Sequence, residues 1–160
     1  MEITIRKFRD KDQVQAHILI KTILKEEFAV DEHLYAGIDL INIQNAYNGK
    51  RDVFFVAVCN DVVVGTAAIK EDDEETALLR RVFVAPEFRG KGIGIELISK
   101  TVEFCGKNGY QRINFRATER MQAAINNLCS KHSFKLKESV QMGPVKILKL
   151  SRKLHHKKKL

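Results

Sequence analysis

The chain has 160 residues, of which 44% are hydrophobic, and this is enough apolar content for one domain with a sizeable core. Its apolar runs are far shorter than the roughly 20 residues that cross a bilayer, and no basic-then-apolar export pattern opens the chain, so we expect a cytoplasmic protein outside the membrane. The net charge of +8 is concentrated in the last nine residues, five of which are Lys or Arg.

This charge pattern predicts a single domain over residues 1–151 and a basic, solvated tail over residues 152–160. No aromatic residues interleave with the charges and no base-reading motif is present, so we do not expect nucleic-acid binding, although it stays an alternative. The adjacent His155 and His156 have no Cys or carboxylate nearby, so we expect no metal. The cysteines lack the spacing of a zinc site or disulfide framework, and we expect buried thiols at Cys59, Cys105 and Cys129.

The first fifty residues predict a strand and two helices. Alternating apolar residues predict a strand over residues 2–8, and an apolar stripe at spacings of three and four predicts a helix over residues 10–28. Asp39 is well placed to cap a second helix, which an Asn-Gly pair at residues 48–49 can end.

A hairpin and an acidic loop follow. Two β-branched and aromatic runs predict the hairpin over residues 53–70, with its turn at an Asn-Asp pair. Five consecutive carboxylates at residues 71–75 then lead into a further strand. Such a run is usually a solvated loop because its charges repel one another. Its last two members, Glu74 and Glu75, are nevertheless candidates to reach a substrate amine.

The stretch that carries chemistry is a strand, a glycine-rich loop and a helix over residues 79–107. The strand ends at Pro86, and Gly90, Gly92 and Gly94 stand directly before an amphipathic run. A helix start has backbone N–H groups without intrahelical partners and the positive end of the peptide dipole. Glycines let an anion approach these amides, and neighbouring Arg and Lys side chains add charge. The pattern therefore predicts a phosphate or pyrophosphate site.

Two familiar phosphate loops do not fit the spacing. A P-loop requires a Ser or Thr after its Gly-Lys pair to hold magnesium, and Lys91 is followed by glycine. A dinucleotide-binding fold requires G-x-G-x-x-G directly after a strand, whereas these glycines alternate and stand several residues beyond the strand.

The last third of the chain predicts a strand, a helix and a closing pair of strands. The first strand covers residues 112–117 and should run parallel to the strand before the glycine loop, because a helix joins the two. A helix over residues 119–131 follows, with His132 at its end as a packed or capping residue. An antiparallel pair over residues 134–140 and 145–150 closes the domain.

Residues 84–94 read Val-Ala-Pro-x-x-Arg-Gly-x-Gly-Ile-Gly, and they resemble the acyl-CoA signature Arg/Gln-x-x-Gly-x-Gly/Ala of the GNAT superfamily of N-acetyltransferases. The order of elements fits that family over about residues 1–150. The resemblance implies an α/β (α+β) fold with a central, mostly antiparallel mixed sheet and helices on both faces. One parallel pair of strands would splay apart, with acetyl-CoA in the cleft.

The resemblance also assigns binding roles. The end of the strand before the loop would hold the pantetheine arm, and the loop amides would bind the CoA pyrophosphate. The implied cofactor-binding residues are Phe83, Val84, Arg89, Gly90, Lys91, Gly92, Ile93 and Gly94. The first helical pair forms one wall of the acceptor pocket in this family, and the implied substrate contacts, each equally compatible with packing, are Glu27, Phe28, Tyr35 and Tyr47.

Two proton-handling side chains of the family are not matched. Residues 128–134 resemble Leu-Tyr-x-Lys-x-Gly-Phe, whose tyrosine often protonates the CoA sulfur, but the tyrosine position is Cys129 and the glycine position is Ser133. Some members carry a glutamate base at the position of Leu78. The catalytic residues stay open, and the candidates are Glu74, Glu75 and Cys129.

The resemblance implies direct transfer of the acetyl group of acetyl-CoA to a primary amine of a small molecule, peptide or protein. A thiol with a pKa of about 8.5 leaves with little help, but a Lys amine with a pKa of about 10.4 must first lose a proton. An α-amine with a pKa near 8 is partly neutral already, so the missing base favours α-amino or other weakly basic acceptors. The alternative is a CoA-binding sensor or non-catalytic relative, and we expect a monomer or homodimer.

Overall fold

The computed structural model describes residues 2–34 and 37–155. Its strands are β1 (Thr4–Lys7), β2 (Val53–Cys59), β3 (Val62–Glu71), β4 (Thr76–Val84), β5 (Arg112–Thr118), β6 (Lys135–Met142) and β7 (Val145–Lys153). Its α-helices are α1 (Gln13–Glu27), α2 (Ile38–Ile41), α3 (Ile43–Ala46), α4 (Ile93–Lys107) and α5 (Gln122–Lys131). Short 3-10 helices are η1 (Asp10–Asp12), η2 (Ala29–Leu34) and η3 (Pro86–Phe88).

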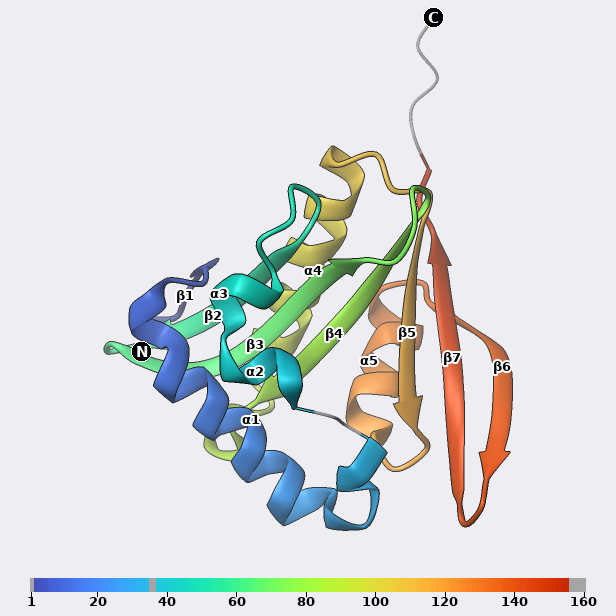
Figure 1. The fold of residues 1–160 in the computed structure, drawn as a ribbon, viewed down its shortest axis with the longest axis horizontal. Coiled ribbons are helices and arrows are strands. Elements are labelled where there is room, and N and C mark those ends of the chain that lie inside the picture. The colour runs from blue at the N-terminus through green and yellow to red at the C-terminus, as the bar shows by residue number, and fades with distance from the viewer. Residues whose placement is uncertain (1, 35–36, 156–160) are drawn as a thin grey trace, which may run out of the picture.

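The strands form one sheet in the order β1-β2-β3-β4-β5-β7-β6. Neighbouring strands are antiparallel except for β4 and β5, which run parallel as a strand–helix–strand connection requires. Helices α1 to α3 cover one face of the sheet, and α4 and α5 cover the other (Figure 1). The predicted fold class, a mostly antiparallel mixed sheet with one parallel pair, is confirmed.

The two parallel strands separate along their length. They pair only from Thr76 opposite Arg112 to Leu78 opposite Asn114, and beyond that point they diverge (Figure 1). In the same region β4 carries a bulge against β3, where the backbone of Arg81 has a φ of 56°. The Thr66 hydroxyl donates to the Arg81 carbonyl at 2.7 Å and holds the bulge in place. The last half of β4 therefore has a free edge toward β5.

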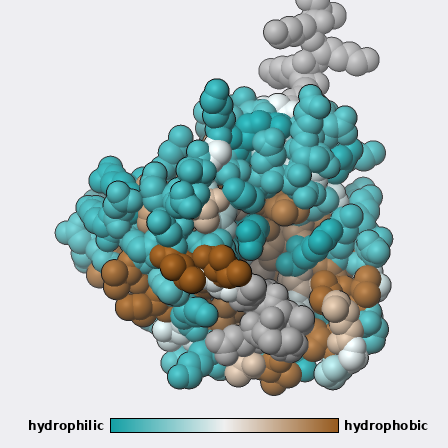
Figure 2. Space-filling model, in the orientation of Figure 1, coloured by the Kyte–Doolittle hydropathy of each residue, from teal (hydrophilic) through white to brown (hydrophobic). Residues whose placement is uncertain are grey.

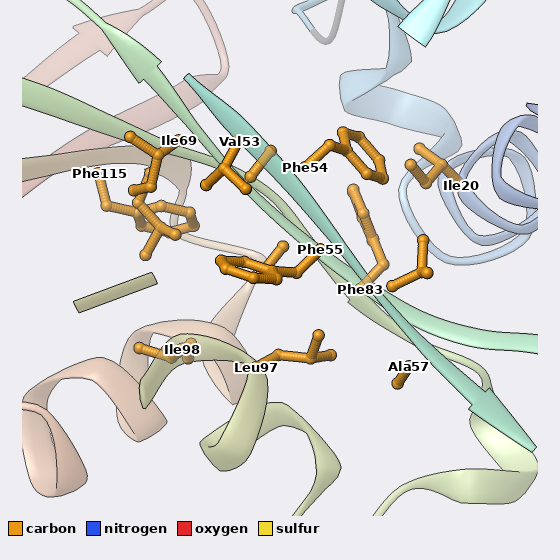
Figure 3. Close-up of a cluster of buried hydrophobic side chains, with 14 of the residues drawn as sticks. Ile20, Val53, Phe54, Phe55, Ala57, Ile69, Phe83, Leu97, Ile98 and Phe115 are labelled. Carbon is orange, nitrogen blue, oxygen red and sulfur yellow. The ribbon is translucent and has the colours of Figure 1, made fainter. Parts of the chain in front are cut away.

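The core lies in two layers, one on each face of the sheet. Consecutive residues of a strand point to opposite faces, so Phe54 lies toward Ile20 of α1 while Phe55 lies toward Leu97 and Ile98 of α4 (Figure 3). This double burial explains why β2 and β3 are apolar along nearly their whole length. The sheet and α4 thus form a rigid support for the end of β4.

Several predicted boundaries are confirmed, and others are wrong. The hairpin turn has the left-handed backbone of a tight turn, with a φ of 49° at Asn60 and 64° at Asp61. Asp39 does not cap a helix: α2 begins one residue earlier, after Gly37, and the Asp39 carboxylate binds Arg81 instead. Helix α5 begins at Gln122 rather than at residue 119, because a turn follows β5.

The end of the domain also differs from the prediction. Strand β7 pairs with β5 through Lys153, and Leu154 packs against the core, so Arg152 and Lys153 belong to the sheet rather than to a tail. His156 and the residues after it lie outside the described part of the chain. Within that part, no helix is long and apolar enough to cross a membrane.

Candidate active site

A cleft of about 520 Å³ opens where the diverging strands meet the helix starts. The end of α1 forms one wall, the end of β4 with the glycine loop forms the floor, and the β5–α5 turn with the start of α5 forms the other wall. Its lining residues are Ile23, Glu27, Phe28, Val82, Phe83, Val84, Phe88, Arg89, Gly90, Gly92, Ile93, Gly94, Ile95, Arg120, Met121, Gln122, Ala123, Ala124 and Asn127.

The glycine loop has the backbone that its sequence predicts. Gly90 and Gly92 have φ values of 76° and 81°, which side chains of L-residues rarely permit. Gly92 is the N-cap of α4, and no side chain caps that helix start. The first amides of α4 are therefore available at the cleft, together with the positive end of the helix dipole.

Arg89 is already engaged with neighbouring groups in this structure. Its two terminal nitrogens donate to the Glu27 carboxylate at 2.8 Å each, and its Nε donates to the Val84 carbonyl at 2.9 Å. The hydrogen bonds and charge of Glu27 raise the pKa of Arg89 above its ordinary value. The pair joins α1 to the glycine loop across the rim of the cleft. An anion bound at the loop would therefore share Arg89 with Glu27.

A second cavity, of about 280 Å³, lies between the diverging strands on the α1 side of the sheet. It shares Val82, Phe83 and Met121 with the cleft, so the two meet at the end of β4. Its other lining residues are Leu78, Leu79, Arg80, Arg81, Asn114, Phe115 and Arg116. Figure 2 shows a hollow on this face with hydrophobic atoms in its floor and hydrophilic atoms around it.

A buried network stands behind this cavity. Asp39 accepts hydrogen bonds from the Arg81 Nε at 3.0 Å and from the Tyr47 hydroxyl at 2.7 Å. Burial alone would raise the pKa of Asp39, but the hydrogen bonds and positive charges around it outweigh burial and lower it. Tyr47 is 7% exposed and lines neither cavity, and burial raises its pKa. Tyr47 therefore packs and orients Asp39 in this structure.

The other predicted site residues fall into two groups. Glu27, Phe28 and the predicted cofactor residues line the cleft, except for Lys91, whose ammonium lies 5.8 Å from the Phe88 ring centroid. The catalytic candidates lie elsewhere. Glu74 and Glu75 precede the far end of β4, a strand of nine residues, and at about 3.3 Å per residue they are roughly 30 Å from Val84. Tyr35 lies outside the described residues.

Cys129 does not lie at the site either. Its side chain is exposed, whereas Cys59 and Cys105 are buried, so the prediction of a buried thiol is wrong for this residue. His132 is buried and caps α5, and burial lowers its pKa, as expected of a packed residue. Among the side chains that the structure describes, those of residues 2–31 and 37–155, no cluster of three His, Cys, Asp or Glu could hold a metal ion.

Sequence reasoning missed the wall formed by the β5–α5 turn and the start of α5, with Arg120, Met121 and Asn127. A signal was present, because the carboxyl ends of parallel strands meet at one edge of a sheet and residues after β5 must lie near those after β4. Sequence reasoning also missed Arg80 of β4 and Arg116 of β5, because only the register between these two strands brings both residues to the second cavity.

Comparison with known proteins places the chain in a family. The model of the GNAT acetyltransferase family matches residues 18–132. A probable N-acetyltransferase, camello, from Xenopus tropicalis is 29% identical over 109 residues, which are 66% of this chain and 49% of that protein. N-acetylaspartate synthetase from Danio rerio is 40% identical over 72 residues, 44% of this chain and 26% of that protein. The chain thus spans half or less of these relatives.

Solved structures share the fold over nearly the whole chain. A GNAT acetyltransferase from Staphylococcus aureus Mu50 has a TM-score of 0.85 at 22% identity, covering 96% of this chain and 100% of its own. The protein yncA from Salmonella typhimurium, solved with its cofactor acetyl-CoA, has a TM-score of 0.79 at 19% identity, covering 97% and 95%. With the family model matching most of its length, this chain belongs to the GNAT family of acetyltransferases.

Proposed function

We propose that the protein transfers the acetyl group of acetyl-CoA to a primary amine. The observation that carries the proposal is the uncapped start of α4 behind a left-handed Gly92, facing a cleft beside the free edge of β4. A pyrophosphate suits the helix start, because backbone amides and the helix dipole both favour an anion there.

The shape of the cleft suits the rest of the cofactor. Beyond Leu78 the backbone of β4 has no partner strand on its β5 side, so Phe83 and Val84 offer an edge to an extended, amide-containing arm. An arm bound along this edge would bring its thioester to Val82, Phe83 and Met121, where the cleft meets the second cavity. The amine would then approach from the second cavity.

The reaction needs few groups from the protein. The amine nitrogen attacks the thioester carbonyl carbon, a C–N bond forms and the C–S bond breaks. The sulfur leaves as a thiolate that takes up a proton, and the ammonium nitrogen releases one. Holding the two reactants together contributes on the order of 7–11 kcal/mol, more than a positioned acid or base, which gives about 10²- to 10⁴-fold.

The residues around the cavities favour an acceptor whose amine is partly neutral at working pH. Leu78 lines the second cavity where a base would act, and Cys129 lines neither cavity. An α-amine, with a pKa near 8, meets this requirement better than a Lys side chain. The relative from Danio rerio is named for aspartate, whose only amine is an α-amine. This similarity supports an α-amino acceptor.

A second candidate is a CoA-binding sensor that does not catalyse. The same two residues favour it, since Leu78 has no titratable group and Cys129 lines neither cavity. A screen of primary amines separates the two functions, with free thiol and acetylated amine measured together. We expect one thiol per acetylated amine. Tight binding of acetyl-CoA without thiol release from any amine would establish the sensor instead.

A further inference from the structure

Two arginines face each other across the gap between the diverging strands. The last paired residues are Leu78 on β4 and Asn114 on β5. Residues two apart in a strand share a face. Arg80 and Arg116 each stand two residues beyond this last pair, so they lie opposite each other on the same face as Leu78 and Asn114. Both line the second cavity together with Leu78 and Asn114. The strands have separated here, and the cavity lies between the two residues.

The bulge in β4 sends two adjacent arginines to different places. Arg81 turns into the protein, where its side chain is 5% exposed and binds Asp39 through two nitrogens. Arg80 stays at the cavity with a side chain that is 37% exposed, and its nearest carboxylate oxygen, on Asp39, is 3.8 Å away. Asp39 already accepts hydrogen bonds from Arg81 and Tyr47, so it compensates Arg80 only weakly.

Arg116 has no compensating charge among the described residues. No ion pair or hydrogen bond joins its exposed guanidinium to the side chains that the structure describes, those of residues 2–31 and 37–155. Its cross-strand neighbour on β7 is another cation, Lys149, whose own neighbour on β6 is Glu138. Among the described residues that line the cavity, none is a carboxylate. Two arginines with spare N–H donors therefore line a small space to which no described residue contributes a carboxylate.

We propose that the acceptor is a small amine that carries a carboxylate, such as an acidic amino acid, and that Arg80 and Arg116 bind this carboxylate. Guanidinium groups bind carboxylates through paired N–H donors, which fixes orientation as well as charge. The amine then points to Val82, Phe83 and Met121, where the two cavities meet. The inference rests on the proposed function and names the class of its acceptor.

The size of the cavity fits such a molecule. Its volume of about 280 Å³ lies just below the usual range for ligand pockets, about 300–1,000 Å³. An amino acid fits inside it. Leu78, Leu79 and Phe115 suit the carbon skeleton of the acceptor, while Arg80 and Arg116 would bind its carboxylate.

The test compares acids with their own amides at saturating acetyl-CoA. Aspartate is paired with asparagine and glutamate with glutamine, and thiol release gives kcat/KM for each acceptor. Each kcat/KM is divided by the fraction of the acceptor whose amine is neutral, so that acceptors of different basicity can be compared. Arg80→Gln and Arg116→Gln remove one guanidinium each. Lys137→Gln removes the same charge from β6, outside both cavities, and serves as the matched control.

We expect the wild-type protein to prefer each acid over its amide. Arg80→Gln and Arg116→Gln should lower kcat/KM for the acids by about 10- to 100-fold, the usual loss of a hydrogen bond to a charged group, and change it for the amides by less than about threefold. Lys137→Gln should change neither. Affinity for acetyl-CoA, measured by calorimetry, should stay constant and show that every variant is folded.

Two results would overturn the inference while the proposed function stands. One is equal kcat/KM for each acid and its amide in the wild-type protein. The other is an equal loss on acids and amides in the arginine variants. If no amine caused thiol release, the proposed function itself would be wrong, and the inference about its acceptor would fail with it.

Discussion

Gly92, the N-cap of α4, and Gly94, in the first turn of that helix, stand two residues apart but tolerate a side chain differently. Gly92 has a left-handed backbone, and an L-residue there costs about 1–2 kcal/mol. A Cβ at Gly94 would make ordinary contacts, 3.6 Å from Asn127 and from Val84. We predict that Gly92→Ala weakens acetyl-CoA binding by about tenfold, while Gly94→Ala stays within about twofold. Calorimetry measures both, and equal affinities would contradict the loop assignment.

The ion pair between Glu27 and Arg89 predicts that substituting its two members changes the affinity for acetyl-CoA in opposite directions. Glu27→Gln removes a negative charge from the rim of the cleft and frees Arg89, so affinity for acetyl-CoA should rise by up to about fivefold at low salt. Arg89→Ala should lower the affinity. Both side chains are partly exposed, so neither change should alter the melting temperature much. If Glu27→Gln also weakened binding, the pair itself would be part of the site.

Cys129 occupies the position where the family often has a proton-donating tyrosine, yet it is exposed and lines neither cavity. We predict that Cys129→Ala lowers turnover by less than roughly tenfold, below the usual effect of losing a general acid. Steady-state thiol release at saturating acetyl-CoA checks this. A loss of several hundredfold would show that the thiol reaches the leaving sulfur.

The network of Asp39, Arg81 and Tyr47 joins α2 to the bulge of β4. Removing the carboxylate would leave the buried Arg81 guanidinium without the negative charge of Asp39. We therefore predict that Asp39→Asn lowers the free energy of unfolding by about 3–5 kcal/mol, as for other broken buried pairs. Asp72→Asn, in the exposed acidic loop, should change it by less than about 0.5 kcal/mol. Urea denaturation of both variants gives the comparison.

The same network makes this stability depend on pH. The folded-state pKa of Asp39 lies below its ordinary value, so its ionised form stabilises the fold above the unfolded pKa of about 3.9. That contribution is lost as pH falls through the folded pKa. The difference between wild type and Asp39→Asn should therefore be constant from about pH 5 upward and shrink below about pH 4. A difference that grew on acidification would contradict this assignment.

Elements defined by nearby residues could be predicted from the sequence. The hairpin of β2 and β3 needs only its two apolar runs and the turn between them. Asp39 was misread as a helix cap because its partner Arg81 stands 42 residues further along the chain. Lys153 was assigned to a tail because its charge suggests solvent, whereas pairing with Arg112 places it in the sheet. Long-range pairing decided both positions.

The candidate site also has one part that nearby residues predict and one part that depends on long-range pairing. The glycine loop could be found because all its parts are consecutive, from the end of β4 to the start of α4. The second cavity could not, because it exists only where β4 and β5 stop pairing after Leu78. Arg80 and Arg116 come together through that register alone. The sequence pattern thus indicated a cofactor site, and the topology of the sheet was needed for the acceptor side.

At the scale of the whole molecule, the missing base predicts how the rate depends on pH. Turnover should rise with pH until the acceptor amine is neutral, because the described residues at the cavity junction, Val82, Phe83 and Met121, cannot remove its proton. Rate profiles for two amines of different basicity should therefore differ, each with an inflection at the pKa of its own amine. One inflection shared by both amines would instead indicate a base in the protein.

The central claim is that the cleft brings acetyl-CoA and an amine together so that the acetyl group moves directly between them. Acetyl-CoA labelled with ¹³C at the acetyl carbonyl tests this most directly, because NMR distinguishes thioester, amide and free acetate. We predict that the signal moves from thioester to amide in step with thiol release, and that Gly92→Ala slows this transfer. A label that stays on bound CoA, or appears only in acetate, would contradict the account.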